Sequence, residues 1–121
     1  MKLPGAQIDV DVTGVGGVPD AGVTAAVVNV TAVQPTATSH LTVWPAGAAR
    51  PDASSLNFPA GATVPNLVIA RVGADGHVSL FNNSGQVHVL FDVVGYFTTA
   101  APLGSLHGLT PARLLDTRDG T

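Results

Sequence analysis

The residues with the clearest chemical potential lie near the end of the chain, in the run Leu114-Leu115-Asp116-Thr117. Two apolar residues followed by Asp-Thr form the pattern of the catalytic loop of aspartic peptidases, whose two carboxylates share one proton. That loop needs a glycine after Asp-Thr, because the backbone must turn tightly there. This chain has Arg118 instead, and a guanidinium beside Asp116 favours the ionised carboxylate. A small aspartic-type hydrolase is therefore a remote alternative, and we assign no catalytic residue.

Paired carboxylates are the next candidates, as ligands of a metal ion. Asp9 and Asp11 share one face of a predicted strand, and Asp116 lies close in sequence to Asp119. Calcium takes about six to eight oxygen ligands, so either pair supplies only part of a site. We expect these carboxylates to be solvated and predict no metal and no cofactor, with calcium as the alternative.

Cysteine and histidine add no stronger signal. The chain has no cysteine, which excludes disulfides, a thiolate nucleophile and a Cys-based zinc site. The histidines share no ligand spacing, although His77 and His88 are expected on neighbouring strands. We interpret these two as solvent-facing strand positions rather than as a metal pair.

Three aromatic residues are candidates for stacking on a sugar ring, namely Trp44, Tyr96 and Phe81. Trp44 falls on the polar side of its predicted strand, just before Pro45, where its ring would be available to a ligand. The alternative is that Trp44 packs in the core or is covered by a loop.

Asp92 is an unusual carboxylate, because it sits within the apolar run "VLFDVVGYF". Alternation predicts that it shares its face with Leu90, Val94 and Tyr96. A buried carboxylate needs a cation, since an unpaired buried charge costs several kcal/mol. We predict an ion pair of Asp92 with Arg113 or Arg118 that holds the last strand in the sheet, with solvent exposure of Asp92 as the alternative.

The composition describes the body that must position these residues. With 121 residues, 45% of them hydrophobic, the chain is long enough for one domain with a core of its own. All eight acids are Asp, and Lys2 is the only lysine, so the residues that furnish exposed helical faces are scarce. A net charge of −3 gives no footprint for nucleic acid or for an anionic membrane, and we predict neither as a partner.

Alternation of apolar and polar residues recurs along the whole chain. It predicts about eight or nine short strands separated by Gly, Pro and Asn turns, the rhythm of an antiparallel β-sandwich or jelly roll without substantial helix. The strands are expected near residues 7–14, 23–33, 40–44, 55–58, 66–72, 77–81, 86–97 and 112–117. The second of these is apolar on nearly all of one face and is expected to be central in its sheet.

The end of the chain is expected to complete the sheet. Residues 98–105 resemble a linker, and residues 109–121 form a terminal strand motif that packs in its own sheet or in that of a neighbouring molecule. Donation to a neighbour would produce a self-assembling subunit. The exchanged segment would be Ala112, Arg113, Leu114, Leu115, Asp116 and Thr117.

The central sequence also carries a family likeness. It lies in Asn29-Val30-Thr31, Leu41-Thr42-Val43-Trp44-Pro45, Ser55-Leu56-Asn57-Phe58, Val64-Pro65-Asn66, Val72-Gly73 and Asp92-Val93-Val94-Gly95-Tyr96-Phe97. With these elements, residues 23–97 and 109–117 resemble a β-rich repeat of actinobacterial secreted and cell-surface proteins. That repeat occurs singly or in tandem, often appended to cell-wall amidases, peptidases or glycosidases. In the tandem proteins the "TPARLLDTR" segment begins a repeat, whereas here it comes last.

The resemblance implies a secreted or cell-surface location and assigns no catalytic residue. The run Met1-Lys2-Leu3-Pro4 has no apolar signal segment, so the chain is either cytosolic or a piece of a longer exported protein, and we favour the second. We predict a non-catalytic module for adhesion, cell-wall glycan binding or spacing, with cell-wall polysaccharide as a partner. The alternative of another class is a homo-oligomeric structural subunit joined by strand exchange.

Overall fold

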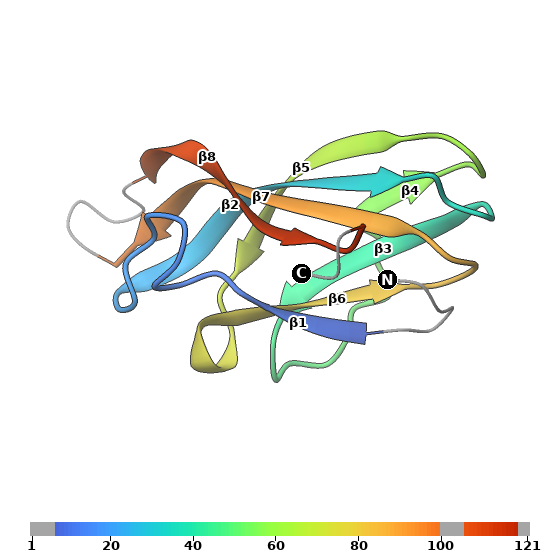
Figure 1. Ribbon diagram of the computed structural model, residues 1–121. Helices are drawn as coiled ribbons and strands as arrows, with labels where there is room; N and C mark the ends of the chain where they lie inside the picture. The colour runs from blue at the N-terminus through green and yellow to red at the C-terminus, as the bar shows by residue number, and fades with distance from the viewer. Residues whose placement is uncertain (1–6, 100–105, 119–121) are drawn as a thin grey trace.

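The computed structural model describes residues 7–99 and 106–118, and this part of the chain forms two facing antiparallel sheets (Figure 1). Sheet A has the strand order β1 (Gln7–Asp11), β6 (His77–Asn82), β3 (Ser39–Pro45) and β4 (Leu56–Phe58). Sheet B has the order β5 (Val64–Arg71), β2 (Val23–Val33), β7 (His88–Thr98) and β8 (Leu106–Asp116). The helical content of the described residues is one 3-10 turn, η1 (Ala74–Gly76). The predicted all-β sandwich is confirmed.

The core lies between the two sheets and follows from the alternation within each strand. In β2, Ala26, Val28, Val30 and Ala32 are completely buried, and β2 is central in sheet B as expected. Burial of a valine or leucine side chain stabilises the fold by about 1.5–3 kcal/mol. Sheet A supplies the opposite half of the core: Val10, Leu41, Val43, Leu56, Phe58, Val78 and Leu80.

A β-bulge in β7 changes which side chains share a face. Val27 pairs with Gly95 and Val28 pairs with Val93, so Val94 has no partner on β2. An extra residue in one strand reverses the faces of the residues that follow it. Tyr96 therefore packs against the core, and the prediction that it shares the face of Asp92 is wrong.

The end of the chain completes sheet B of its own molecule. β8 pairs antiparallel with β7, and it begins at Leu106, six residues before the predicted strand at 112–117. Three residues, Leu109 to Pro111, bulge opposite Val94, and an edge position tolerates the missing N–H of Pro111. The part of the terminal motif at residues 119–121 lies outside the described residues.

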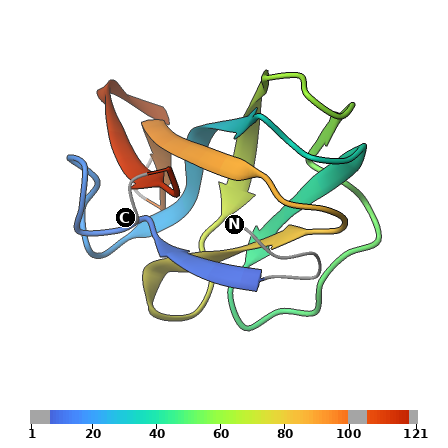
Figure 2. The ribbon, with the colours of Figure 1, turned by 45° about the vertical axis from the view of Figure 1, so that its right-hand side comes forward.

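A glycine-rich loop connects the edge of sheet A to sheet B and packs against β8 (Figure 2). The loop runs from the end of β1 to the start of β2, and Val12 and Val18 anchor it in the core. Gly16 has a φ of +61°, and a Cβ at this position would lie 3.0 Å from side-chain atoms of Leu114 and Val93. Only glycine allows the backbone to approach β8 this closely without strain.

No helix in the described ranges is long and apolar enough to cross a membrane.

Candidate functional site

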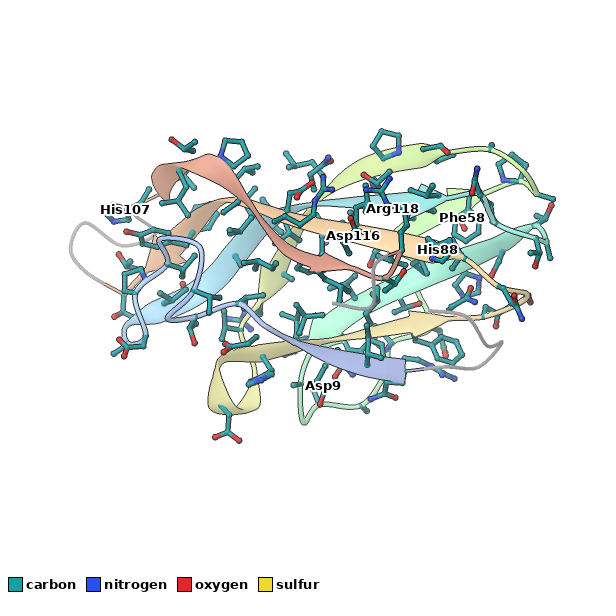
Figure 3. All side chains as sticks on the ribbon, viewed as in Figure 1. Asp9, Phe58, His88, His107, Asp116 and Arg118 are labelled. Atoms are coloured by element: carbon teal, nitrogen blue, oxygen red, sulfur yellow. The ribbon has the colours of Figure 1, made fainter. Side chains whose placement is uncertain are left out.

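The Asp-Thr motif lies in a network of charges on the outer side of β7 and β8. The guanidinium of Arg118 donates two hydrogen bonds to the carboxylate of Asp116, with Nε–Oδ1 at 3.0 Å and Nη2–Oδ2 at 2.8 Å. Arg113 Nη1 lies 3.5 Å from Asp116 Oδ2, and the Asp116 side chain is only 10% exposed. Figure 3 shows Asp116 and Arg118 side by side, with Asp9 on the opposite side of the molecule.

These contacts hold Asp116 in its ionised form. The hydrogen bonds from Arg118 lower the pKa of Asp116 from 3.8 to about 2, against the opposing effect of burial, and the charge of Arg113 lowers it further. A proton shared between two carboxylates requires the opposite environment, in which one carboxyl stays protonated. The geometry therefore gives the motif a structural role that differs from that of a peptidase loop. Asp119, the other acid of this segment, lies outside the described residues.

Asp92 pairs with Arg113, one of the two arginines that the sequence offers. Arg113 Nε lies 2.7 Å from Asp92 Oδ1 and its Nη2 lies 3.2 Å from Oδ2, a bidentate contact between adjacent strands. The hydrogen bond and the charge of Asp92 raise the pKa of the Arg113 guanidinium. Because the Asp92 side chain is 18% exposed, the pair lies on the outer face of the sheet rather than in the core.

The proposed sugar-stacking residues are covered by the chain itself. Trp44 is 4% exposed, and its Nε1 donates a hydrogen bond to the carbonyl of Ala48 in the loop between β3 and β4, at 3.0 Å. From the same loop, the Arg50 guanidinium lies 3.8 Å from the centre of the Phe81 ring. Trp44 thus follows the loop-covered alternative, and Phe81 is occupied by a cation–π contact.

The ring of Tyr96 is also engaged within the protein. It stacks on His107 of β8, with the ring centres 4.9 Å apart and the planes inclined by 12°. His107 stands directly opposite Tyr96 in the register of the two strands. This stack belongs to the pairing of β7 with β8, and it takes up one face of the ring that a sugar would use.

The candidate metal ligands do not converge. Asp9 accepts a hydrogen bond from Ser79 Oγ at 2.6 Å, and Asp11 accepts one from the backbone N–H of Thr13 at 3.2 Å. In the described part of the chain, no group of three metal-binding side chains comes together. The expectation that His77 and His88 lie on neighbouring strands is wrong, because β6 belongs to sheet A and β7 to sheet B.

A feature that the sequence reasoning missed is the outer face of sheet B. Leu67, Ile69 and Leu106 are 59%, 62% and 60% exposed, and all three lie on this face by their register with β2 and β7. The run "NLVIARV" carries apolar residues on both faces of the strand. This pattern was the sequence signal that could have indicated an apolar outer face. We call the following residues the apolar face: Ala25, Val27, Leu67, Ile69, Phe97 and Leu106. Of these, Ala25 and Val27 on the central strand β2 are only 9% exposed.

Two paired glycines lie on the same side of sheet B as the apolar face. Gly95 and Gly108 pair directly across β7 and β8, and a Cβ at Gly108 would meet no atom within 4 Å. At Gly95 a Cβ would lie 2.9 Å from the carbonyl oxygen of His107 and 3.6 Å from Leu106 Cδ1, so the open backbone of this pair is that of Gly108 on the edge strand β8. Searches for matches to this chain among protein-family models, curated proteins and solved structures find none.

Proposed function

We propose that this chain is a non-catalytic β-sandwich module of a secreted or cell-surface protein, and that it serves adhesion or spacing by packing its apolar face against a second copy. The observation that carries the proposal is the exposure of Leu67, Ile69 and Leu106 on one sheet face. Leu67 and Ile69 neighbour one another on the edge strand β5, and Leu106 lies across the same face on β8. Exposed apolar patches on folded domains mark interaction sites.

The size of the whole outer face of sheet B, which includes the apolar face, suits a second copy of the same module. Four strands about 4.8 Å apart, with the length of the eight residues of β5, present about 500 Å² in projection. Two such faces bury about 1,000 Å², the lower limit for a specific interface.

The charges of the face also suit self-association. Asp92, Arg113, Asp116 and Arg118 compensate one another through the ion pairs described above, so two copies do not bring together a surplus of one sign. Arg71 adds one cation at the edge strand β5. Like-charge repulsion, which would oppose a twofold contact, is therefore small.

The proposed location rests on the likeness of residues 23–97 to repeats of actinobacterial surface proteins, where such modules occur in tandem. A tandem arrangement supplies a second module of the same kind at high effective concentration. Adhesion or spacing through the apolar face also fits the burial of Trp44 and the ring contacts of Phe81 with Arg50 and of Tyr96 with His107, which reduce the aromatic surface available for stacking on a glycan.

Sedimentation equilibrium of the wild type and of the double variant Leu67→Ser/Ile69→Ser tests the proposal. Both side chains are more than half exposed, so the double variant should keep the fold, which circular dichroism verifies. We expect the wild type to dimerise with concentration and the variant to remain monomeric. Val15→Ser is the matched control, because Val15 is 37% exposed but lies in the loop beside β1. A monomeric wild type, or equal effects of both changes, contradicts the proposal.

Strand exchange remains the second candidate function, since β8 is an edge strand paired only with β7 in sheet B. Strand exchange and face packing differ in how fast the dimer dissociates. A face-packed dimer dissociates soon after dilution, whereas an exchanged dimer must first release β8 from β7 and persists longer. An assembly that survives dilution and tolerates Leu67→Ser/Ile69→Ser favours exchange of the segment at residues 112–117.

A further inference from the structure

A small polar pocket lies at the end of the sandwich where two turns meet. The turn between β2 and β3 supplies Gln34 and Thr36, and the turn between β6 and β7 supplies Gln86 and Val87. His88, at the start of β7, completes the lining of this end pocket, which has a volume of about 260 Å³. Figures 1 and 2 both show the two turns side by side, and Figure 3 marks His88 near them.

The lining of the end pocket is rich in hydrogen-bonding groups and carries no carboxylate, lysine or arginine. Gln34 and Gln86 each offer a carboxamide that both donates and accepts hydrogen bonds. Within residues 7–99 and 106–118, neither carboxamide bonds to another protein group. Both are therefore free to bind an outside molecule that has donors and acceptors close together.

Hydrogen bonds between the two turns hold the end pocket in shape. The backbone N–H of Thr36 donates to the carbonyl of Gln86 at 2.8 Å, and the N–H of Gln86 donates to Thr36 Oγ1 at 2.8 Å. On the far side, Thr117 Oγ1 lies 3.4 Å from Nδ1 of His88 and accepts a hydrogen bond from the N–H of Val89. A site held in this way loses little entropy when it binds a ligand.

The backbone at Gln34 is strained. Its φ is +51°, in the left-handed region that non-glycine residues seldom adopt. Such a conformation costs about 1–2 kcal/mol, and residues that keep it cluster at ligand sites. In the part of the chain that the structure describes, the other non-glycine residue with a positive φ is Asp75, which lies in an Asp-Gly turn that explains it.

We infer that the end pocket binds a neutral, hydroxyl-rich ligand, a single pyranose ring of a glycan. Each sugar hydroxyl both donates and accepts, which matches the carboxamides of Gln34 and Gln86, and the absence of carboxylate, lysine and arginine matches a neutral ring. The volume is below the range of about 300–1,000 Å³ that is usual for larger ligands. The site goes beyond the proposed self-association, because none of its residues belongs to the apolar face.

An NMR titration of the folded, ¹⁵N-labelled chain tests the inference. The probes are methyl glucoside and N-acetylglucosamine, with glucuronate as the charged comparison. We expect saturable shifts of the side-chain NH₂ signals of Gln34 and Gln86, at millimolar affinity because no Trp, Tyr or Phe ring lines the pocket. No saturable shift with either neutral sugar, or tighter binding of glucuronate, overturns the inference.

Three glutamine variants sharpen this test. Gln86→Ala removes one carboxamide and should weaken sugar binding about five- to tenfold, as loss of a hydrogen bond does. Gln34→Gly removes the other carboxamide and also relieves the backbone strain, so it should weaken binding while the protein stays as stable as the wild type. Gln7→Ala is the matched control, because Gln7 is exposed at the start of β1 and does not line the end pocket, and it should leave binding unchanged. Equal loss in all three variants contradicts the assignment.

Discussion

At the scale of single residues, the outer side of β7 and β8 is organised by four charged groups. Arg113 contacts both Asp92 on β7 and Asp116 on its own strand, and Arg118 forms a bidentate ion pair with Asp116. Partial burial strengthens these contacts relative to an ion pair in water, and the bidentate geometry adds direction. The network fastens the last strand to its neighbour.

The contact between Asp92 and Arg113 predicts that removal of the Asp92 carboxylate destabilises the fold more than removal of the Asp20 carboxylate. Asp92→Ala should lower the free energy of unfolding by about 1 kcal/mol, since it removes a bidentate pair at a partly exposed position. Asp20→Ala, at an exposed loop position, should have little effect. Thermal unfolding of both variants measures the difference, and equal melting temperatures would show that the pair does not hold β8.

Asp116 predicts how stability depends on acid. Its pKa in the folded protein is about 2, below the ordinary 3.8, so the folded state binds fewer protons than the unfolded state between these values. The stabilisation is complete above about pH 4 and declines as the pH falls towards 2. Melting temperatures measured across this interval should fall, and the fall should be smaller in Asp116→Asn. An identical acid profile in the variant would refute the assignment.

At the scale of elements, the glycine loop between β1 and β2 depends on two separate properties of glycine. Gly16 and Gly22 both have positive φ, but a Cβ would crowd β8 only at Gly16 and would meet no atom within 4 Å at Gly22. Gly16→Ala should therefore cost about 1 kcal/mol for backbone strain plus about 1–3 kcal/mol for overpacking. Gly22→Ala should show the first cost alone. Urea unfolding separates the two, and equal losses would mean that the loop does not press on β8.

The loop between β3 and β4 acts as a lid on the outer face of sheet A. Trp44 lies beneath it, and its indole N–H is satisfied by the carbonyl of Ala48. Because Trp44 is the only tryptophan, native fluorescence should be blue-shifted and should move to the red on unfolding. Trp44→Phe removes the indole donor and should speed hydrogen exchange of the loop amides while the sheet amides keep their protection. Native emission typical of exposed indole would contradict the burial of this ring.

At the scale of the whole molecule, one apolar core joins the two sheets. Strands of both sheets contribute completely buried residues, among them Val28 and Val89 of sheet B and Leu80 of sheet A. Neither sheet has a separate core, so unfolding should be cooperative. Trp44 fluorescence reports on sheet A and far-ultraviolet circular dichroism reports on both sheets. Coincident midpoints in urea are expected, and two separated transitions would contradict a single cooperative unit.

The sequence predicted the individual strands but not which strands share a sheet. The alternation of β2 predicted its buried face and its central place, because nearly all of one face of this strand is apolar. The same reasoning placed His77 and His88 on adjacent strands. This prediction is wrong, because β6 belongs to sheet A and β7 belongs to sheet B. The alternation of residues within one strand does not depend on which distant strand pairs with it, so strand pairing cannot be predicted from that alternation.

The candidate sites divide in the same way. The position of Asp92 in an apolar run predicted that it pairs with a cation. The sequence limited the candidates to Arg113 and Arg118 of the last segment, and the structure shows Arg113. The bulge at Val94 turned Tyr96 towards the core, and the lid covered Trp44, so neither ring stands free for stacking. A bulge and a lid are long-range features that depend on register and on loop packing.

The sequence by itself determined which residues form strands and which face of each strand is apolar, because backbone sterics and burial act with a period of two along the chain. Only the tertiary structure decided what covers those faces. It placed a loop over sheet A, left Leu67 and Ile69 in solvent at the edge of sheet B, and brought Gln34 beside Gln86. These outcomes rest on contacts between residues far apart in sequence, whose geometry is set by the packing of the complete fold.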